Sequence, residues 1–423
     1  MIKRIISFLT FGALTFTTTL NSQFDQVSVG PLYNVHTFYS LGEGALNSVE
    51  NSAWDIAFSS QGVQDAGIFV NESAALAGQE QVEIYIPQTG IYDDVFEVDT
   101  ESWTRLYNSE VDWQNGAFNS IKDEIDVFDY GWGQYNPSTN TVEGNQVYLI
   151  KLRDGSWKKM FVENLFFDWN FKYADLDGQN EVFASVSKAE HIENVLAYFS
   201  FSTGETVDVE PTSWDLLVTR YNTYTEDGNG NFEDYVVTGL LSGLDVQVAE
   251  KDDVDPDQIS HTDILAEEYK SELDVIGFDW KTVDFNTSLF TIDDDRVFFV
   301  KNAEDNVCKL QLIDFEGAST GIMTIKKECS IIASTEIVGL YELQLYPNPT
   351  TDYIHMLTDF QEETSVNLRL VDMNGRAWIN INKNVDSGFN QTKLRLRNIP
   401  NGNYHFVIQT KNGVKSQPII IVN

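Results

Sequence analysis

Two stretches of the sequence place side-chain oxygens at alternating positions, as a site for a hard cation requires. In the first, Asp175, Asp177 and Glu181 surround Gly178, and the run 227–233 is of the same kind. Calcium binds clusters of carboxylate and amide oxygens around a turn-forming glycine. Neither stretch has the glycine and glutamate spacing of an EF-hand loop. We therefore expect either a calcium site at Asp175, Asp177 and Glu181 or a solvated acidic turn.

Two motifs of familiar catalytic machinery are absent. The sequence contains no H-E-x-x-H and no phosphate-binding P-loop. Paired carboxylates could serve glycoside hydrolysis, but a chain with 65 acidic residues contains such pairs everywhere. We predict that the protein is not an enzyme.

Only two cysteines occur, Cys308 and Cys329. Few cysteines suit an oxidising compartment, where they pair. The two can form one disulfide closing a loop of about twenty residues, but spacing alone does not fix the distance between them. The bridge and two free thiols both remain open.

The elements that must position these residues are β-strands. Residues 54–58 alternate between apolar and small or polar side chains, which is the period of a strand. The runs 147–152 and 297–301 are rich in β-branched and aromatic residues. One segment, 262–273, has apolar residues at helical spacing and predicts a helix. We expect a mainly all-β protein of antiparallel β-rich domains.

The chain contains an internal duplication. Residues 38–58 align without a gap with residues 198–218, and a Trp-Asp pair recurs at the same place in both. Residues 147–160 align in the same way with 297–310. Two matches in the same order predict two copies of one unit, roughly 32–190 and 191–335. We expect the tryptophans to anchor cores, with their indole N–H groups hydrogen-bonded.

The last part of the chain has a different texture. It combines the motif Y-P-N-P at 346–349, D-x-N-G-R at 372–376 and I-P-N-G-N-Y at 399–404 with short strand-like runs. Asn374 and Gly375 predict a tight hairpin turn, and the whole predicts a small β-sandwich. The segment closely resembles the type A C-terminal sorting domain of the type IX secretion system, although it ends in Ile-Val-Asn rather than near a basic residue.

That resemblance implies contact with the type IX secretion machinery, passage across the outer membrane, and then release or attachment at the cell surface. The N-terminus agrees with it. Lys3 and Arg4 precede an apolar stretch, 5–16, and small Ser22 stands at a plausible cleavage position. This is the architecture of a signal peptide. No later apolar stretch is long enough for a transmembrane helix, so we expect none in the mature chain.

The body between these ends resembles the HmuY-like family of surface or secreted β-proteins, through its Trp-Asp units and the strand pair at 147–159. The founding type of that family is a haemophore, so the resemblance implies haem as a candidate cofactor. Haem iron takes histidine or methionine ligands. The candidates in the body are His36, His191 and His261; Met160 aligns with Leu310 inside a repeated strand, which favours core packing.

The charge is distributed unevenly. Residues from 340 onward hold eight of the 27 basic and seven of the 65 acidic residues, so the body carries essentially all of the net charge of −38. Such a surface repels nucleic acid. We predict a signal peptide at 1–22, β-rich repeats at 23–190 and 191–340, and a sorting domain at 341–423. The expected role is non-catalytic binding, of haem or another ligand; the alternative is a cell-surface adhesin or a calcium-stabilised structural or glycan-binding protein.

Overall fold

The computed structural model describes residues 23–62, 65–75, 80–87, 92, 97–226, 230–284, 287, 289–303, 305–330, 339–372, 376–411 and 413–422. The predicted signal peptide, 1–22, lies outside these residues. The regular structure within them consists of antiparallel strands and short 3-10 helices, which confirms the all-β prediction. No helix in the described ranges has the length and hydropathy to span a membrane.

The first module is a pair of sheets formed by residues 56–207. Its first sheet has the order β13-β12-β11-β10-β6-β7, with the hairpin β8–β9 on β11. These strands are β6 (Glu83–Ile86), β7 (Thr104–Leu106), β8 (Gly133–Asn136), β9 (Thr141–Gly144), β10 (Val147–Lys151), β11 (Trp157–Leu165), β12 (Asp168–Asp175) and β13 (Val182–Ser187). The second sheet has the order β15-β14-β4-β5, from β4 (Ile56–Ser59), β5 (Ile68–Val70), β14 (Leu196–Ser200) and β15 (Glu205–Val207). Aromatic residues such as Trp132 and Trp169 fill the core between them.

The second module repeats this plan with residues 23–50 and 216–330. One sheet has the order β1-β23-β22-β21-β18, from β1 (Gln23–Ser28), β18 (Gln247–Lys251), β21 (Val297–Lys301), β22 (Val307–Phe315) and β23 (Ile322–Ser330). The other has the order β17-β16-β2-β3, from β2 (Val35–Ser40), β3 (Gly44–Glu50), β16 (Leu216–Glu226) and β17 (Phe232–Ser242). A separate hairpin joins β19 (Lys281–Asp284) to β20 (Leu289–Ile292). The core of the second module contains Trp280 and Phe315.

The two modules exchange hairpins. The hairpin β2–β3 comes just before β4 in the chain, yet β2 pairs with β16 of the second module. The hairpin β14–β15 comes just before β16, yet β14 pairs with β4 of the first module. The sequence repeats, predicted to meet at residue 190, are therefore interleaved in space: one sheet of the first module and both sheets of the second contain strands from either side of that position.

The aspartates of the repeated Trp-Asp pairs form hydrogen bonds with the exchanged hairpins. Asp55 Oδ2 accepts the backbone N–H of Phe201 at 2.7 Å, and Asp215 Oδ2 accepts that of Leu41 at 2.7 Å. In both cases the acceptor precedes a central strand, and the donor follows the exchanged strand of the other repeat. Asp215 lies 160 positions after Asp55, and Phe201 lies 160 positions after Leu41. The duplication seen in the sequence thus appears again in equivalent hydrogen bonds.

The tryptophans of these pairs pack between the modules. Trp54 makes an edge contact with Tyr198 at 4.9 Å between ring centroids, and Trp214 makes one with Phe38 at 5.1 Å. Both belong to an apolar cluster that spans the exchanged strands. Trp214 Nε1 donates to Glu210, whereas Trp54 Nε1 is buried without an acceptor in the described part of the chain. The predicted core role is confirmed; the predicted hydrogen bond exists at Trp214 only.

The predicted helix at 262–273 is wrong. Two 3-10 helices occur there instead, η5 (His261–Asp263) and η6 (Ala266–Glu268). Between and after them, Ile264, Leu265 and Tyr269 have extended backbone angles. The next residue, Lys270, exchanges two backbone hydrogen bonds with Val248 on the edge strand β18. Pairing with that edge satisfies backbone groups that an α-helix would have bonded internally.

Cys308 and Cys329 form a disulfide, which settles the question that their spacing left open. They stand directly opposite each other on β22 and β23. Cys308 is buried in the core of the second module, and Cys329 packs against that core. The bridge therefore ties two neighbouring strands of one sheet together.

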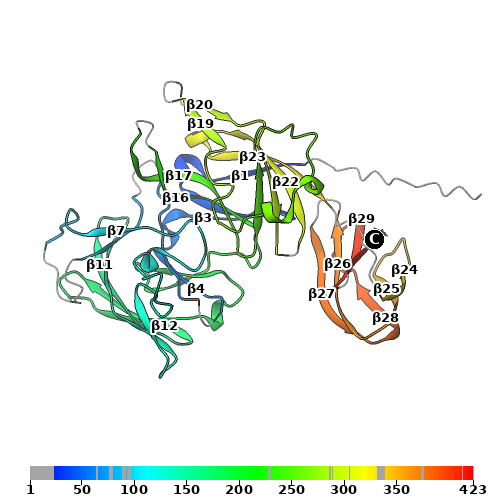
Figure 1. Ribbon diagram of the computed structural model, residues 1–423, viewed down its shortest axis with the longest axis horizontal. Helices are drawn as coiled ribbons and strands as arrows, with labels where there is room; N and C mark the ends of the chain where they lie inside the picture. The colour runs from blue at the N-terminus through cyan, green and yellow to red at the C-terminus, as the bar shows by residue number, and fades with distance from the viewer. Residues whose placement is uncertain are drawn as a thin grey trace, which may run out of the picture.

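The C-terminal sandwich comprises residues 340–422, and Figure 1 shows it as a separate unit beside the second module. One sheet contains β24 (Leu340–Tyr346), β25 (Tyr353–Phe360) and β28 (Gly388–Arg395), in chain order. The other has the order β27-β26-β29-β30, from β26 (Thr364–Asp372), β27 (Ala377–Val385), β29 (Gly402–Thr410) and β30 (Gly413–Ile421). The predicted turn at Asn374 and Gly375 lies outside the described residues, between two strands that do pair.

The three sequence motifs of this sandwich have structural roles. Asn348 of the Y-P-N-P motif bonds the last strand twice, through Pro418 O and the N–H of Ile420, both at 2.9 Å. Asp372 accepts the indole N–H of Trp378 at 2.9 Å. Tyr404 donates to Pro400 O at 2.8 Å. The first contact thus joins the link between β24 and β25 to β30, the second joins the end of β26 to β27, and the third holds the segment just before β29.

Candidate ligand pocket

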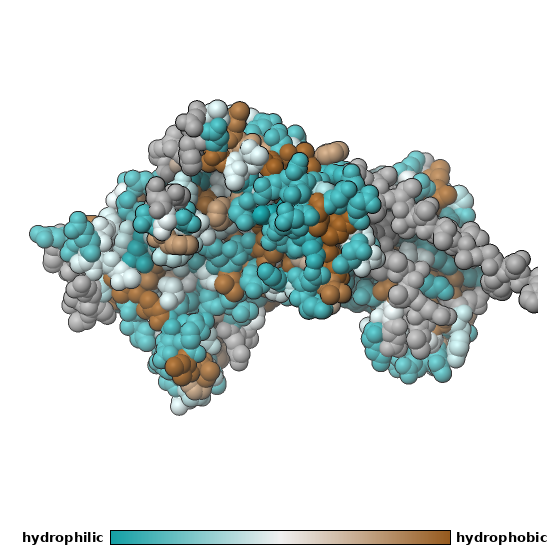
Figure 2. All heavy atoms as spheres, turned by 45° about the horizontal axis from the view of Figure 1, so that its top comes forward, coloured by the Kyte–Doolittle hydropathy of each residue, from teal (hydrophilic) through white to brown (hydrophobic). Residues whose placement is uncertain are grey.

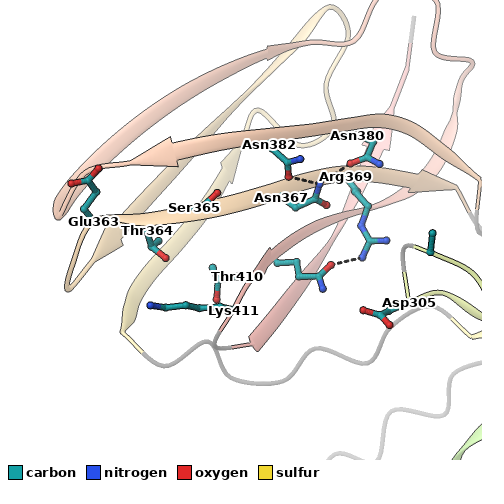
Figure 3. A pocket seen from close by; sticks show the side chains of 12 residues that line it. Asp305, Glu363, Thr364, Ser365, Asn367, Arg369, Asn380, Asn382, Thr410 and Lys411 are labelled. Carbon is teal, nitrogen blue, oxygen red and sulfur yellow. Dashed lines mark hydrogen bonds between the residues drawn. The ribbon is translucent and has the colours of Figure 1, made fainter. Parts of the chain in front are cut away.

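Two cavities stand out in the described structure. The larger, of about 640 Å³, is a polar crevice between the C-terminal sandwich and Ala303 and Asp305 of the second module. Figure 3 shows Asn367, Asn380 and Asn382 bonded in a ladder along its wall, with Arg369 beside them. Arg369 is 1% exposed and donates to Gln409 Oε1 at 3.0 Å and to Asn306 Oδ1 of the second module at 3.3 Å. The polar crevice is thus the joint between two units.

The other cavity, of about 540 Å³, lies within the second module, and we call it the aromatic pocket. It is enclosed by the hairpin β16–β17, the hairpin β19–β20, and the side chains of Tyr33, Phe278 and Phe315. Its lining residues are Tyr33, Arg220, Thr225, Glu226, Glu233, Tyr235, Val236, Val237, Thr238, Phe278, Lys281, Val283, Phe290 and Phe315. Sites for small ligands have this range of volume and this mixture of apolar rings with a few polar groups.

Rings form much of the pocket wall. Phe290 and Phe315 meet edge to face at 4.8 Å, and Tyr33 stacks on Phe315 at 6.0 Å. Tyr235 is 57% exposed, so its ring is open to an incoming ligand. Figure 2 shows apolar residues of the surface in small groups on an otherwise hydrophilic face.

Lys281 brings a positive charge into the pocket. Its Nζ donates to Thr238 O at 2.6 Å and to Phe278 O at 3.0 Å, and it lies 4.1 Å from the centre of the Trp280 ring. Burial lowers the pKa of Lys281 to about 7, because desolvation disfavours the ammonium form. The nearby charge of Asp279 opposes this lowering of the pKa, but within the described residues no carboxylate lies close enough to form an ion pair with Lys281.

Arg220 is the second cation of the pocket. It stands opposite Thr238 in the pairing of β16 with β17. Its two terminal nitrogens donate to backbone carbonyls, those of Ala74 and Val236, and its Nε is buried without an acceptor in the described chain. The guanidinium lies 5.4 Å from the centre of the Tyr33 ring. Burial lowers the pKa of Arg220 as well.

These two cations could not be singled out from sequence patterns alone. They come from strands far apart in the chain, and lysine and arginine carry no motif here. One signal was available. The aromatic patch 129–135 corresponds to 277–283 in the second repeat, so that Trp132 matches Trp280 and Gly133 matches Lys281. A charged residue in place of a glycine next to a core tryptophan marks a difference between the copies.

The three histidines expected from the resemblance occupy different elements, and none lines the aromatic pocket. His36 lies on β2 between the modules, is 3% exposed, and makes edge contacts with Phe38 at 5.8 Å and Trp54 at 6.3 Å. Burial lowers the pKa of His36 to about 4. His191 ends the 3-10 helix η4 (Ala189–His191), and His261 begins η5. The structure does not bring these three residues together.

The predicted calcium ligands lie at the turn between β12 and β13. Asp175 pairs with Lys158 at 2.5 Å and accepts a hydrogen bond from Asn180 at 2.6 Å. Glu181 pairs with Lys172 at 3.9 Å, and Asp177 accepts the backbone N–H of Gln179. No group of three metal-ligating side chains occurs within the described residues, and 227–229 of the second acidic run lie outside them. Calcium binding stays a prediction, which these contacts do not favour.

Comparison with known proteins identifies one part of the chain. Residues 344–422 match the family model described as a secretion system C-terminal sorting domain. Among solved structures, dimeric latent PorU from Porphyromonas gingivalis is similar at 9% identity, over 94% of this chain and 34% of that one, with a TM-score of 0.18. This chain spans about a third of that protein's length, and so low a TM-score supports no conclusion. No curated protein matches the sequence.

None of these comparisons supports the resemblance of the body to the HmuY-like family. The family match to the tail agrees with the sandwich of two antiparallel sheets and with the three motifs that hold it together. Residues 344–422 are therefore a type IX secretion system C-terminal sorting domain, and the protein that carries them is exported to the outer-membrane surface or secreted.

Proposed function

We propose that the body of this exported protein is a non-catalytic binding module and that its ligand enters the aromatic pocket. One observation carries the proposal: two half-buried cations, Arg220 and Lys281, line one aromatic cavity with no carboxylate paired to either among the described residues. The chain has 65 acidic residues and 27 basic ones. Carboxylates are therefore abundant, and two unpaired cations at one place need a reason.

The physical reason is the cost of burying charge. A cation removed from water loses hydration, and backbone carbonyls replace it only in part. The lowered pKa of Lys281 expresses that cost. A ligand with an anionic group would restore the missing partner, while its apolar part covers the rings. Binding would therefore gain from both charge pairing and apolar contact.

Haem binding remains a prediction from resemblance alone. The described lining of the aromatic pocket contains neither histidine nor methionine. His36 is the most deeply buried of the predicted haem ligands, and an iron could reach it only if the contacts with Trp54 and Phe38 opened. A role as a surface adhesin is compatible with the proposal where the ligand is part of another cell's surface.

The proposal can be tested by filling the pocket. Val283 lies on β19 and is half-buried in the pocket wall, so Val283→Trp should occupy the cavity. The matched control is Val182→Trp, on the exposed strand β13 of the first module. Thermal unfolding of the full chain is followed with a panel of oligosaccharides, aromatic acids and haemin.

We expect at least one compound to raise the melting temperature of the wild type and of Val182→Trp but not of Val283→Trp. Stabilisation of all three proteins by the same compounds would place binding elsewhere and refute the proposal. So would a panel in which no compound stabilises the wild type.

A further inference from the structure

The aromatic pocket holds recognition groups of three kinds. Arg220 and Lys281 supply positive charge, and the rings of Tyr33, Phe290 and Phe315 supply flat apolar faces. The third kind is carboxylate. Glu226 and Glu233 also line the pocket, at the exposed end of the β16–β17 hairpin.

From this combination we infer that the ligand is an acidic sugar, a short oligosaccharide that carries carboxylate groups. The inference rests on the proposed binding function of the aromatic pocket and names its class of ligand. The sugar carboxylate pairs with Arg220 and Lys281, the ring faces lie against the aromatic residues, and ring hydroxyls donate to Glu226 and Glu233.

The anionic group follows from the two cations. Lys281 has two acceptors, both backbone carbonyls, for its three donor hydrogens. Arg220 has a buried Nε that lacks an acceptor in the described chain. A carboxylate is the ligand group that accepts from guanidinium and ammonium donors together, and charge assistance makes such bonds roughly twice as strong as neutral ones.

The hydroxyl groups follow from the two carboxylates. Glu226 and Glu233 can only accept hydrogen bonds when they are ionised. A flat aromatic acid would bring an anion and an apolar ring to this pocket but no hydrogen-bond donors for the two glutamates. A sugar acid offers both a carboxylate and hydroxyl donors. The volume of about 540 Å³ is ample for two or three sugar rings.

The charge balance of the chain sharpens this choice. The body carries nearly all of the net charge of −38, and its field repels anions over the whole surface. An anionic ligand can therefore be held only where local cations outweigh that field. Raising the salt concentration screens the long-range repulsion and the contact pairing together, so salt dependence alone does not identify the pairing. Substitution of the cations does.

The test is calorimetric titration of the full chain with three probes: a galacturonate trisaccharide, a neutral galactose trisaccharide of the same length, and an aromatic carboxylate, naphthoate. The variants are Lys281→Gln and Tyr235→Ala, both in the pocket. Lys270→Gln, an exposed lysine that pairs with β18 only through its backbone, is the matched control. Thermal unfolding of each variant verifies that it is folded.

We expect the galacturonate probe to bind at least about tenfold more tightly than the neutral sugar and than naphthoate. Lys281→Gln should weaken galacturonate binding about tenfold or more, with little effect on the neutral sugar, and Tyr235→Ala should weaken both sugars. Lys270→Gln should bind as the wild type does.

Equal affinity for the two sugars, or tighter binding of naphthoate, would overturn the inference while leaving the proposed pocket intact, provided that Val283→Trp abolishes that binding. Absence of galacturonate binding would also overturn it. Binding that survives Val283→Trp would overturn the proposed function as well, so the two failures are distinguishable.

Discussion

Asp55 and Asp215 each hold a backbone N–H that belongs to a hairpin of the other repeat. Both carboxylates are buried, so removal of either leaves a buried donor without its acceptor. We predict that Asp215→Ala and Asp55→Ala each lower the free energy of unfolding by about 1–3 kcal/mol. Urea unfolding monitored by tryptophan fluorescence measures the change.

The matched variants are Asp215→Asn and Asp55→Asn, which keep an oxygen at the same position. They should lose less than the alanine variants. If the two alanine variants were as stable as the wild type, the hydrogen bonds that close the exchange would not contribute to stability, and the account of the Trp-Asp pair would be wrong.

Glu110 is the residue from which we expect a measurable pH effect. It packs with Asp274 between the modules and accepts a hydrogen bond from Thr223 at 2.9 Å. Burial and the neighbouring Asp274 raise the pKa of Glu110 from 4.5 to about 8. The folded state therefore binds more protons than the unfolded state between these values, and the contribution of Glu110 to stability falls as pH rises through that window.

The test compares the wild type with Glu110→Gln, which keeps the acceptor for Thr223 but cannot ionise. Other buried groups also titrate, including His36, Glu72 and Lys281, and the difference between the two proteins removes their contributions. We predict that the melting temperature of the wild type minus that of the variant decreases between about pH 5 and about pH 8. A difference that is constant or rises would contradict the assignment.

At the scale of elements, the disulfide between β22 and β23 should be the main covalent support of the second module. Its cysteines are 21 residues apart in sequence. Closing a loop of that size removes entropy from the unfolded chain worth about 3 kcal/mol. We predict a loss of this order in the double variant Cys308→Ala, Cys329→Ala, measured by urea unfolding.

The C-terminal sandwich supplies the internal control, because it contains neither cysteine. Its own unfolding transition should be unchanged in the double variant. A stability equal to that of the wild type in the second module would show that the bridge adds nothing beyond the strand pairing.

The strands themselves were predictable because their signals are local. Alternation at 54–58 and the β-branched runs at 147–151 and 297–301 became β4, β10 and β21. The exchange of hairpins was not predictable, since the pairing of β2 with β16 joins residues that no local pattern connects. The segment 262–273 misled for a related reason. Its spacing suits a helix, but the exposed edge of β18 offered its backbone tertiary partners instead.

The pocket shows the same limit. Tyr33, Arg220, Lys281 and Phe315 meet only because β16 pairs with the exchanged hairpin and the N-terminal strand β1 joins β23. The candidate ligand residues in the sequence were the histidines. No sequence pattern shows which of them is buried, and the structure places them on separate elements. By contrast, the tail could be assigned because three specific motifs occur together within one short part of the sequence.

At the scale of the whole molecule, the chain divides into an acidic body and a nearly neutral sorting domain. The sandwich touches the body through Arg369 with Asn306 and through Arg376 with Glu43, the latter at 3.3 Å. Both contacts are polar. The exposed Arg376–Glu43 pair is a surface ion pair, which contributes about 0–1 kcal/mol. We therefore expect the body to fold without the sandwich.

A chain that ends at residue 340 should accordingly fold, with the melting behaviour of the body in the full chain, but should remain in the periplasm. Cell fractionation followed by immunoblotting measures its location, with the full chain as the control. Normal release or surface display of the shortened chain would show that residues 344–422 are not required for export.

The central claim of this account is that the exported body binds an acidic sugar in the aromatic pocket. Hydrogen–deuterium exchange of the full chain with and without the galacturonate trisaccharide tests it most directly, because the readout is where the protein changes. The account predicts slower exchange in 232–242 and 281–292, which carry β17, β19 and β20, and unchanged exchange in 168–187 of the first module. Protection confined to the first module, to the sorting domain or to the polar crevice, or no protection at all, would contradict it.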